Sequence, residues 1–182
     1  MAGSVEKTYG DALFELILEE KPDSLSATKE ELKSVSSIIS GVPELIKLSK
    51  TPTVGNEEKL GIIEDAFSGK LSEYVYNFIR VLTEAGRLED LNRISKYFGQ
   101  RCNDYLGIAE ITVVTCEPLT ASARAALSEK MSRVLGKKIV MNEELDRSII
   151  GGIVVKNGNT TLDGSVRAKL RALKTDIGSV IC

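Results

Sequence analysis

Apolar residues recur at helical spacing through the first part of the chain, so that each segment has one apolar face. The first segment covers residues 5–20, and five more follow at residues 26–40, 44–49, 56–68, 71–85 and 88–106. Short stretches that contain Pro or Gly separate them, and either Ser24 or Ser26 is expected to cap the second helix. Helices joined by short connections pack as antiparallel neighbours. The pattern therefore predicts a six-helix bundle over residues 1–106.

After Gly107 the apolar period changes to that of a β-strand, which predicts a strand over residues 108–115. A helix over residues 119–135 and a second strand over residues 137–142 follow. The apolar run 149–155 is expected to be a strand, and it leads to the turn dipeptide Asn157-Gly158, a short strand over residues 160–162, and a helix that Asp163 and Ser165 open. These elements predict a small α+β domain over residues 107–182. The expected fold class is mainly α, a six-helix bundle followed by this domain.

The first and fifth helices carry more apolar width than one core-facing stripe needs. Phe14 and Leu18 widen the first helix, and Val81 and Ala85 lie off the core stripe of the fifth helix. Simple burial within the bundle accounts for this width. The alternative is a groove between the two helices that receives an amphipathic helix from another chain.

The last helix carries a narrow apolar stripe with basic residues on its other sides. This stripe packs either on the sheet of its own domain or on a partner, which the basic residues suggest is an acidic helix. The stripe consists of Val166, Leu170, Leu173, Ile177 and Val180, and the basic residues are Arg167, Lys169, Arg171 and Lys174.

Composition is that of an ordinary globular protein: 182 residues, 42% apolar, 27% charged and a net charge of -2. This balance gives no general attraction to nucleic acid, and the basic second part has no aromatic residue after Tyr105 for stacking on bases. Residues 1–106 contain 13 basic and 18 acidic side chains, against 11 and 8 in residues 107–182, which suggests two modules with different partners. With no signal peptide and no apolar span, we expect membrane association only through partners.

The chain lacks the residues that most catalytic and metal sites use. It has no histidine, which excludes Ser-His-Asp and Cys-His nucleophilic sites and the usual metal-ligand sets. There is no phosphate-binding Gly-rich loop, and the three cysteines have no close spacing. Asp163 with Lys156 or Arg167 is the least poor acid–base constellation, but structural ion pairs use the same residues. We therefore expect no catalytic, cofactor-binding or metal-binding residue.

Several ordered motifs resemble those of the delta subunit family of bacterial and plastid F-type ATP synthases, the counterpart of the mitochondrial oligomycin-sensitivity-conferring protein. The resemblance covers essentially the whole length. It differs at Gly10, where the family often has Ala; glycine in a helix costs about 1 kcal/mol relative to Ala, which suggests a weaker helix there. The motifs are Tyr9 with Ala12-Leu13, Asn77-Phe78-Ile79, Gly86-Arg87-Leu88, Gly151-Gly152 with residues 153–155, Asn157-Gly158, and residues 162–167 with Leu170.

The resemblance implies a non-catalytic stator subunit. Its helical domain would hold the amphipathic N-terminal helix of an alpha subunit between the first and fifth helices, on top of the catalytic head. Its second domain would hold the C-terminal end of the b subunits, so that rotary proton transport is coupled to ATP synthesis. The implied location is peripheral, on the cytoplasmic face of a bacterial inner membrane or the stromal face of a thylakoid.

The resemblance also assigns residues to both contacts. The alpha-subunit groove would involve Val5, Thr8, Tyr9, Ala12, Asn77, Val81 and Ala85, and the stalk contact would involve Arg167, Leu170, Leu173 and Ile177. A stand-alone helical adaptor unrelated to ATP synthesis would share the two-sided helices, and it remains the alternative at this point.

Overall fold

The computed structural model describes residues 4–51, 54–67, 69–158 and 160–180, without the side chains of residues 174–180. The chain divides into two compact units, Met1–Cys102 and Asn103–Cys182. Its described residues are mainly helical, and the second unit adds a mixed four-stranded sheet.

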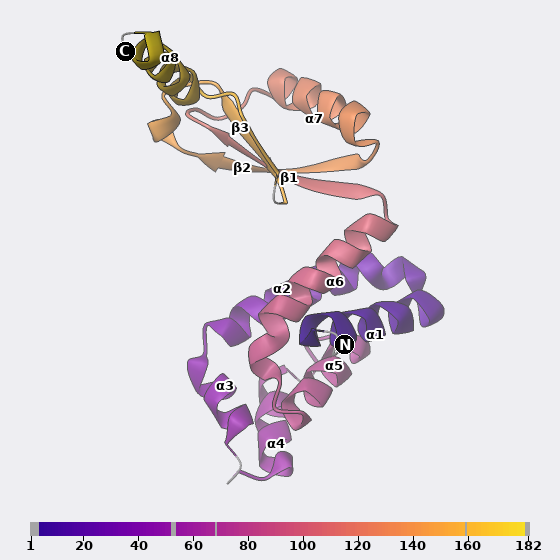
Figure 1. Ribbon diagram of the computed structural model, residues 1–182. Helices are drawn as coiled ribbons and strands as arrows, with labels where there is room; N and C mark the ends of the chain where they lie inside the picture. Colours follow the sequence, from indigo (N-terminus) through magenta and orange to yellow (C-terminus); the bar gives the residue numbers. More distant parts are fainter. Residues whose placement is uncertain (1–3, 52–53, 68, 159, 181–182) are drawn as a thin grey trace. The chain divides into compact units, whose positions relative to one another are not determined.

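The first unit is helical throughout its regular structure (Figure 1). Proline ends α1 and begins α3, because its ring fixes φ and it lacks the N–H that a helix interior needs. The elements are α1 (Val5–Glu20), η1 (Pro22–Ser24), α2 (Leu25–Ser40), α3 (Pro43–Lys50), α4 (Asn56–Phe67), α5 (Glu73–Glu84), η2 (Leu88–Asp90) and α6 (Leu91–Tyr105).

Two local expectations for this unit are wrong. Neither Ser24 nor Ser26 caps α2 through its side chain, because α2 continues directly from the 3-10 turn η1; the Ser24 hydroxyl instead donates to the Lys21 carbonyl at 2.8 Å. The predicted helix over residues 88–106 begins as the separate 3-10 turn η2 before α6 starts at Leu91.

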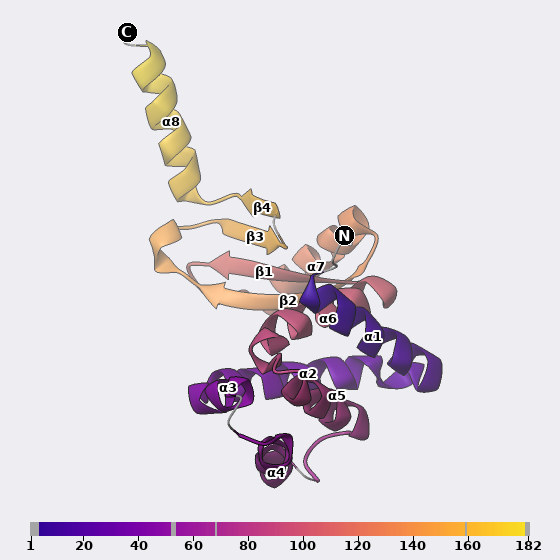
Figure 2. The ribbon, with the colours of Figure 1, turned by 60° about the horizontal axis from the view of Figure 1, so that its bottom comes forward.

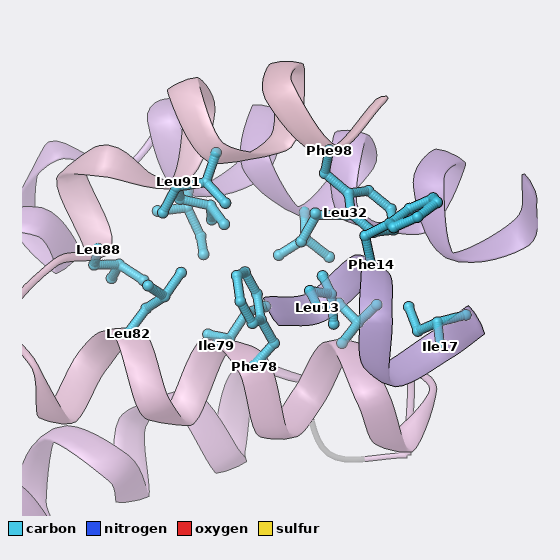
Figure 3. Close-up of a cluster of buried hydrophobic side chains, with 14 of the residues drawn as sticks. Leu13, Phe14, Ile17, Leu32, Phe78, Ile79, Leu82, Leu88, Leu91 and Phe98 are labelled. Atoms are coloured by element: carbon cyan, nitrogen blue, oxygen red, sulfur yellow. The ribbon is translucent and has the colours of Figure 1, made fainter. Parts of the chain in front are cut away.

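One apolar core joins the helices of the first unit (Figure 3). Its members come from the inward faces of α1, α2, α4, α5 and α6 and from η2, and Phe98 and Ile79 are fully buried. Phe14, predicted as an extra flank of α1, is part of this core, and the Arg101 guanidinium lies over its ring at 5.0 Å. The excess width of α1 therefore lies on the other side of the helix, at Ala12 and Leu16.

Gly10 allows α6 to approach α1 closely. A Cβ added at Gly10 would lie 2.5 Å from Cδ1 of Tyr97, which is closer than such atoms pack. The Tyr97 hydroxyl donates to the Asp11 carboxylate at 2.9 Å, and Arg101 forms an ion pair with the same oxygen at 3.1 Å. The absent side chain is therefore required by packing and is not only a weakness of the helix.

The second unit builds its sheet in the order β2-β1-β3-β4 (Figure 2). Strand β1 pairs in parallel with β2 and antiparallel with β3, and β3 pairs antiparallel with β4. Met131 of α7 packs with Ile111, Val113 and Val155, so α7 covers one face of the sheet. The elements are β1 (Ile108–Thr115), α7 (Ala121–Leu135), β2 (Lys138–Leu145), η3 (Arg147–Ile149), β3 (Ile153–Asn157), β4 (Thr160–Asp163) and α8 (Val166–Val180).

The apolar run 149–155 is not one strand. Ile149 ends the 3-10 turn η3 with its side chain buried, and Ile150 is exposed with a φ of 68°. Gly152 then allows the backbone of Gly164 to pass close by, because a Cβ there would lie 2.5 Å from the Gly164 carbonyl oxygen. The chain therefore changes direction at residues 150–152, and β3 begins only at Ile153.

Helix α8 begins at a double cap. The Asp163 carboxylate accepts from the Ser165 backbone N–H at 2.9 Å, and the buried Ser165 hydroxyl accepts from the Ala168 N–H at 3.1 Å. From there α8 extends away from β4 (Figure 2). The stripe residues Val166, Leu170 and Leu173 are exposed, so the described part of this stripe does not pack on the sheet.

The contact at Gly10 predicts opposite effects for two Gly→Ala substitutions. Gly61→Ala, in the middle of α4 where an added Cβ meets nothing, should raise the free energy of unfolding by about 0.5–1 kcal/mol through helix propensity. Gly10→Ala gains the same propensity but forces the Tyr97 ring aside, which costs about 1–3 kcal/mol. Chemical denaturation of both variants measures the difference; a Gly10→Ala protein as stable as Gly61→Ala would contradict the packing role.

The cap of α8 predicts an acid-sensitive second unit. Hydrogen bonds from the Ser165 side chain and backbone hold the pKa of Asp163 below its usual value. A carboxyl whose pKa is lowered by folding stabilises the fold above its unfolded pKa, about 3.9, and loses that effect as the pH falls through the lower folded value. Thermal unfolding of the β1 and β3 amide signals, followed by NMR, should therefore show lower stability below about pH 4.

Asp163→Asn provides the comparison, because its amide oxygen still accepts the bond but does not titrate. We expect this variant to lose part of the acid-dependent fall in stability. Asp163→Ala should destabilise the second unit at neutral pH. The matched control is Asp65→Asn, at an exposed position of α4 in the other unit. An Asp163→Asn protein with the same pH profile as the Asp65→Asn protein would argue against the cap.

Candidate functional site

A groove of about 490 Å³ lies between α1 and α5. Its floor is built from core side chains such as Leu13 and Phe78, which the close-up of the core also contains (Figure 3). The lining residues are Tyr9, Ala12, Leu13, Leu16 and Glu20 from α1, and Glu73, Tyr74, Asn77, Phe78 and Val81 from α5.

Two contacts across the groove fix the relative direction of the helices. The Tyr9 ring meets the Phe78 ring edge-on, with centroids 6.5 Å apart and an interplanar angle of 72°. The Tyr74 hydroxyl donates to Glu20 at 2.9 Å, which places the end of α1 beside the start of α5. The helices are therefore antiparallel, and the groove runs from Glu20 and Glu73 at one end to Tyr9 and Val81 at the other.

The middle of the groove presents apolar side chains to solvent. Leu16 is 42% exposed and Val81 is 50% exposed, while Leu13 and Phe78 beneath them are buried. Ala12 and Asn77 supply small or short side chains between them. An amphipathic helix that fills such a groove buries apolar surface on both sides, which is the main source of affinity in this mode of recognition.

The positions along the two helices explain why the groove forms. On α1 the lining residues are spaced by three or four, a second stripe beside the one that faces the core. Leu13 belongs to both stripes, so the same helix packs inward through Phe14 and Ile17 and outward through Ala12 and Leu16. A single amphipathic helix would leave only polar residues on this side.

Four of the residues that the sequence assigned to the groove line it: Tyr9, Ala12, Asn77 and Val81. Val5, Thr8 and Ala85 do not; Val5 packs against the core, and Thr8 and Ala85 are exposed. Their contact with a bound helix stays a prediction. Leu13, Leu16, Tyr74, Phe78, Glu20 and Glu73 also line the groove, and the sequence did not assign them to it. Helical spacing could have indicated the two glutamates: Glu20 lies four residues after Leu16 and Glu73 lies four residues before Asn77, so each shares a helix face with a groove residue.

The predicted stalk residues lie on α8. Leu170 is 53% exposed and Leu173 is 56% exposed, and the Arg167 guanidinium donates to the Ser148 hydroxyl at 3.2 Å. The side chain of Ile177 lies outside the described part of the structure. The exposed leucines and the neighbouring basic residues are thus available for contact over the described turns of α8.

The acid–base group considered from the sequence, Asp163 with Lys156 or Arg167, is not brought together as a catalytic pair. Asp163 accepts from Ser165, and Lys156 forms an ion pair with Glu144 at 3.5 Å. Burial raises the pKa of the Cys102 thiol to about 11, which keeps it protonated at neutral pH.

Within the described residues, no group of three His, Cys, Asp or Glu side chains is placed to hold a metal ion. The described helices also include none that is long and apolar enough to cross a bilayer.

Comparison with known proteins gives a consistent result. The family model described as "ATP synthase delta (OSCP) subunit" matches residues 5–177. The chain is 30% identical to the ATP synthase subunit delta of Lachnoclostridium phytofermentans over 178 residues, covering 97% of each chain. It is 33% identical to the subunit of the same name from Clostridium kluyveri over 170 residues, covering 93% of each.

A solved structure has the same fold. A chain of the Toxoplasma gondii mitochondrial ATP synthase hexamer, determined by cryo-electron microscopy, superposes with a TM-score of 0.66 at 20% identity. The match covers 96% of this chain and 98% of that one. At this level of identity the likeness concerns the fold alone.

The two stripes of α1 predict different stability effects for two leucines three residues apart. Leu13→Ala removes a buried side chain and should lower the free energy of unfolding by about 2–5 kcal/mol. Leu16→Ala removes a side chain that is 42% exposed and lies outside the core, and it should cost less than about 1 kcal/mol. Urea denaturation compares the two variants. Equal losses would mean that Leu16 belongs to the core and not to an open groove.

Proposed function

The chain belongs to the ATP synthase delta (OSCP) subunit family, and on this premise we propose that the groove between α1 and α5 binds the N-terminal helix of an alpha subunit while α8 binds the C-terminal end of the b subunits. Members of this family are non-catalytic subunits of the peripheral stalk of F-type ATP synthases. The chain is accordingly a structural subunit of that stalk and not an enzyme. The observation that carries the finer proposal is the apolar groove with Leu16 and Val81 open to solvent.

The groove has the properties that helix binding needs. Its two walls are antiparallel helices held by the Tyr9–Phe78 and Tyr74–Glu20 contacts, so the site is formed before a partner arrives. A preformed site loses little conformational entropy on binding. Burying apolar area stabilises the complex by roughly 25 cal/mol per Å² before the cost of association. We take α1 to α6 as a six-helix bundle whose task, over residues 1–106, is attachment to the catalytic head.

The exposed stripe of α8 supports a second contact. Leu170 and Leu173 lie three residues apart on one side of the helix, and Arg167 and Arg171 lie beside them. An apolar seam flanked by basic residues suits an acidic amphipathic helix that packs alongside. We therefore assign residues 107–182, through α8, to the b subunits.

Two attachments in one chain suit a tether under load. Once one domain is bound, the other meets its partner at high effective concentration, so neither contact has to be exceptionally tight. Such a tether keeps the head from turning with the central shaft, and this couples rotary proton transport to ATP synthesis. In this proposal the chain reaches the membrane only through other subunits, on the cytoplasmic face of a bacterial inner membrane or the stromal face of a thylakoid.

The alternative of a stand-alone helical adaptor is not favoured. Family similarity extends over residues 5–177 and includes both units, whereas an adaptor would need to match only the helices that bind its partner. The ATP synthase subunits are therefore the expected partners of both units.

Ala12→Asp tests the head contact. An aspartate in the apolar middle of the groove should weaken binding of a synthetic alpha-subunit N-terminal peptide to the full chain at least about tenfold, since an unpaired charge would be desolvated. Isothermal titration calorimetry measures the affinity. Ala27→Asp is the control, because it adds the same charge at an exposed position of α2 outside the groove. Equal affinity of the two variants would refute the groove assignment.

The stalk contact is tested by the reciprocal variant. Leu170→Asp with Leu173→Asp should abolish co-purification of the b subunits from solubilised host membranes while retaining binding of the alpha peptide. Ala12→Asp should show the opposite pattern. If the doubly substituted α8 still retains the b subunits, another surface of the second unit binds them.

A further inference from the structure

One end of the groove is acidic. Among the described residues that line it, the charged side chains are Glu20, at the end of α1, and Glu73, at the start of α5. Neither has an ion-pair partner within the described part of the chain. The remainder of the lining is apolar, aromatic or amide. The groove is therefore negatively charged at one end and apolar in its middle.

A hydrogen bond holds the Glu20 carboxylate at this end. Tyr74, itself a wall residue, donates to one oxygen of Glu20 and so anchors that side chain beside the start of α5. The pKa of Tyr74 is raised, first because of this hydrogen bond, so the hydroxyl keeps its proton and remains the donor. Arg80, a cation on the same helix as Glu73, lies over the Tyr76 ring and outside the groove lining.

The charge at this end comes from the two side chains and not from the backbone, because the last carbonyls of α1 and the first N–H groups of α5 meet there and their dipoles oppose each other. A purely apolar helix laid over the full groove would remove water from two carboxylates that have no cation beside them, which is unfavourable. A helix with a cation at that point instead gains a charge-assisted contact.

We propose that the acidic end, Glu20 with Glu73, pairs with a Lys or Arg side chain of the bound helix, about one turn beyond the apolar side chain that covers Leu16. This pairing fixes the register of the helix, because the apolar middle alone would accept it shifted by a turn. The inference rests on the proposed function, since it describes how the same groove selects its partner. The occupant is a basic amphipathic helix of another subunit.

The test is calorimetric titration of the full chain with the synthetic N-terminal peptide of the host alpha subunit. Glu20→Gln with Glu73→Gln should bind the peptide about 3- to 10-fold more weakly, as expected for two solvent-accessible ion pairs. The matched control is Glu15→Gln with Glu19→Gln, which removes the same charge from exposed positions of α1 outside the groove. Circular dichroism confirms that both variants are folded.

A second series identifies the partner cation. Each Lys or Arg of the peptide is replaced by Gln in turn and titrated against the wild-type chain and the Glu20→Gln, Glu73→Gln variant. One replacement should weaken binding to the wild type and have no further effect on the variant. Raising the salt concentration should reduce the difference between wild type and variant, because exposed charges are screened.

The outcomes are distinct. If the wild type binds and both double variants bind equally well, the acidic end plays no part and the inference is overturned, while the proposed function stands. If the wild type does not bind the peptide at all, the proposed function fails and the inference with it. If the chain alone sediments as a dimer that Glu20→Gln with Glu73→Gln dissociates, the acidic end binds the basic α8 of a second copy, which also overturns the inference.

Discussion

The structure of the first unit depends on how α1 is packed. This helix buries Leu13, Phe14 and Ile17 in the core, and the absence of a side chain at Gly10 lets Tyr97 of α6 lie directly against it. The Tyr97 hydroxyl and Arg101 then meet Asp11 on the same side. Because α1 is held from this side, its opposite edge, with Ala12 and Leu16, is free to form one wall of a groove with α5.

In the second unit, the described turns of α8 leave their apolar residues exposed. Asp163 and Ser165 satisfy the first N–H groups of α8, and Gly152 lets the chain pass close enough to Gly164 to place that cap. The sheet and α7 complete their own core without α8, through Ile111, Val113, Met131 and Val155. The described part of the α8 stripe, Val166, Leu170 and Leu173, is consequently not part of that core. An exposed apolar stripe of this kind is typical of a surface that contacts another chain.

Periodicity predicted the regular elements well where a single pattern governs a segment. The limits of α1 at residues 5–20 and of β1 at residues 108–115 are confirmed. The prediction of one strand over residues 149–155 was wrong, because hydrophobicity does not reveal a positive φ at Ile150 or the close approach of the Gly164 backbone to Gly152. The cost assigned to Gly10 overlooked Tyr97, which lies 87 positions further along the chain and whose contact no local pattern contains.

The groove marks a more general limit. A helical stripe tells which residues avoid water, but the same spacing serves a core face and a partner-binding face. Leu13 and Leu16 could not be separated by pattern, and only the placement of α5 makes one the floor and the other the open wall. Glu20 and Glu73 are further from prediction, since each is an ordinary helix-end residue in the sequence. They can be recognised as one acidic site only once antiparallel packing brings the end of α1 to the start of α5, where two carboxylates without cations border apolar surface.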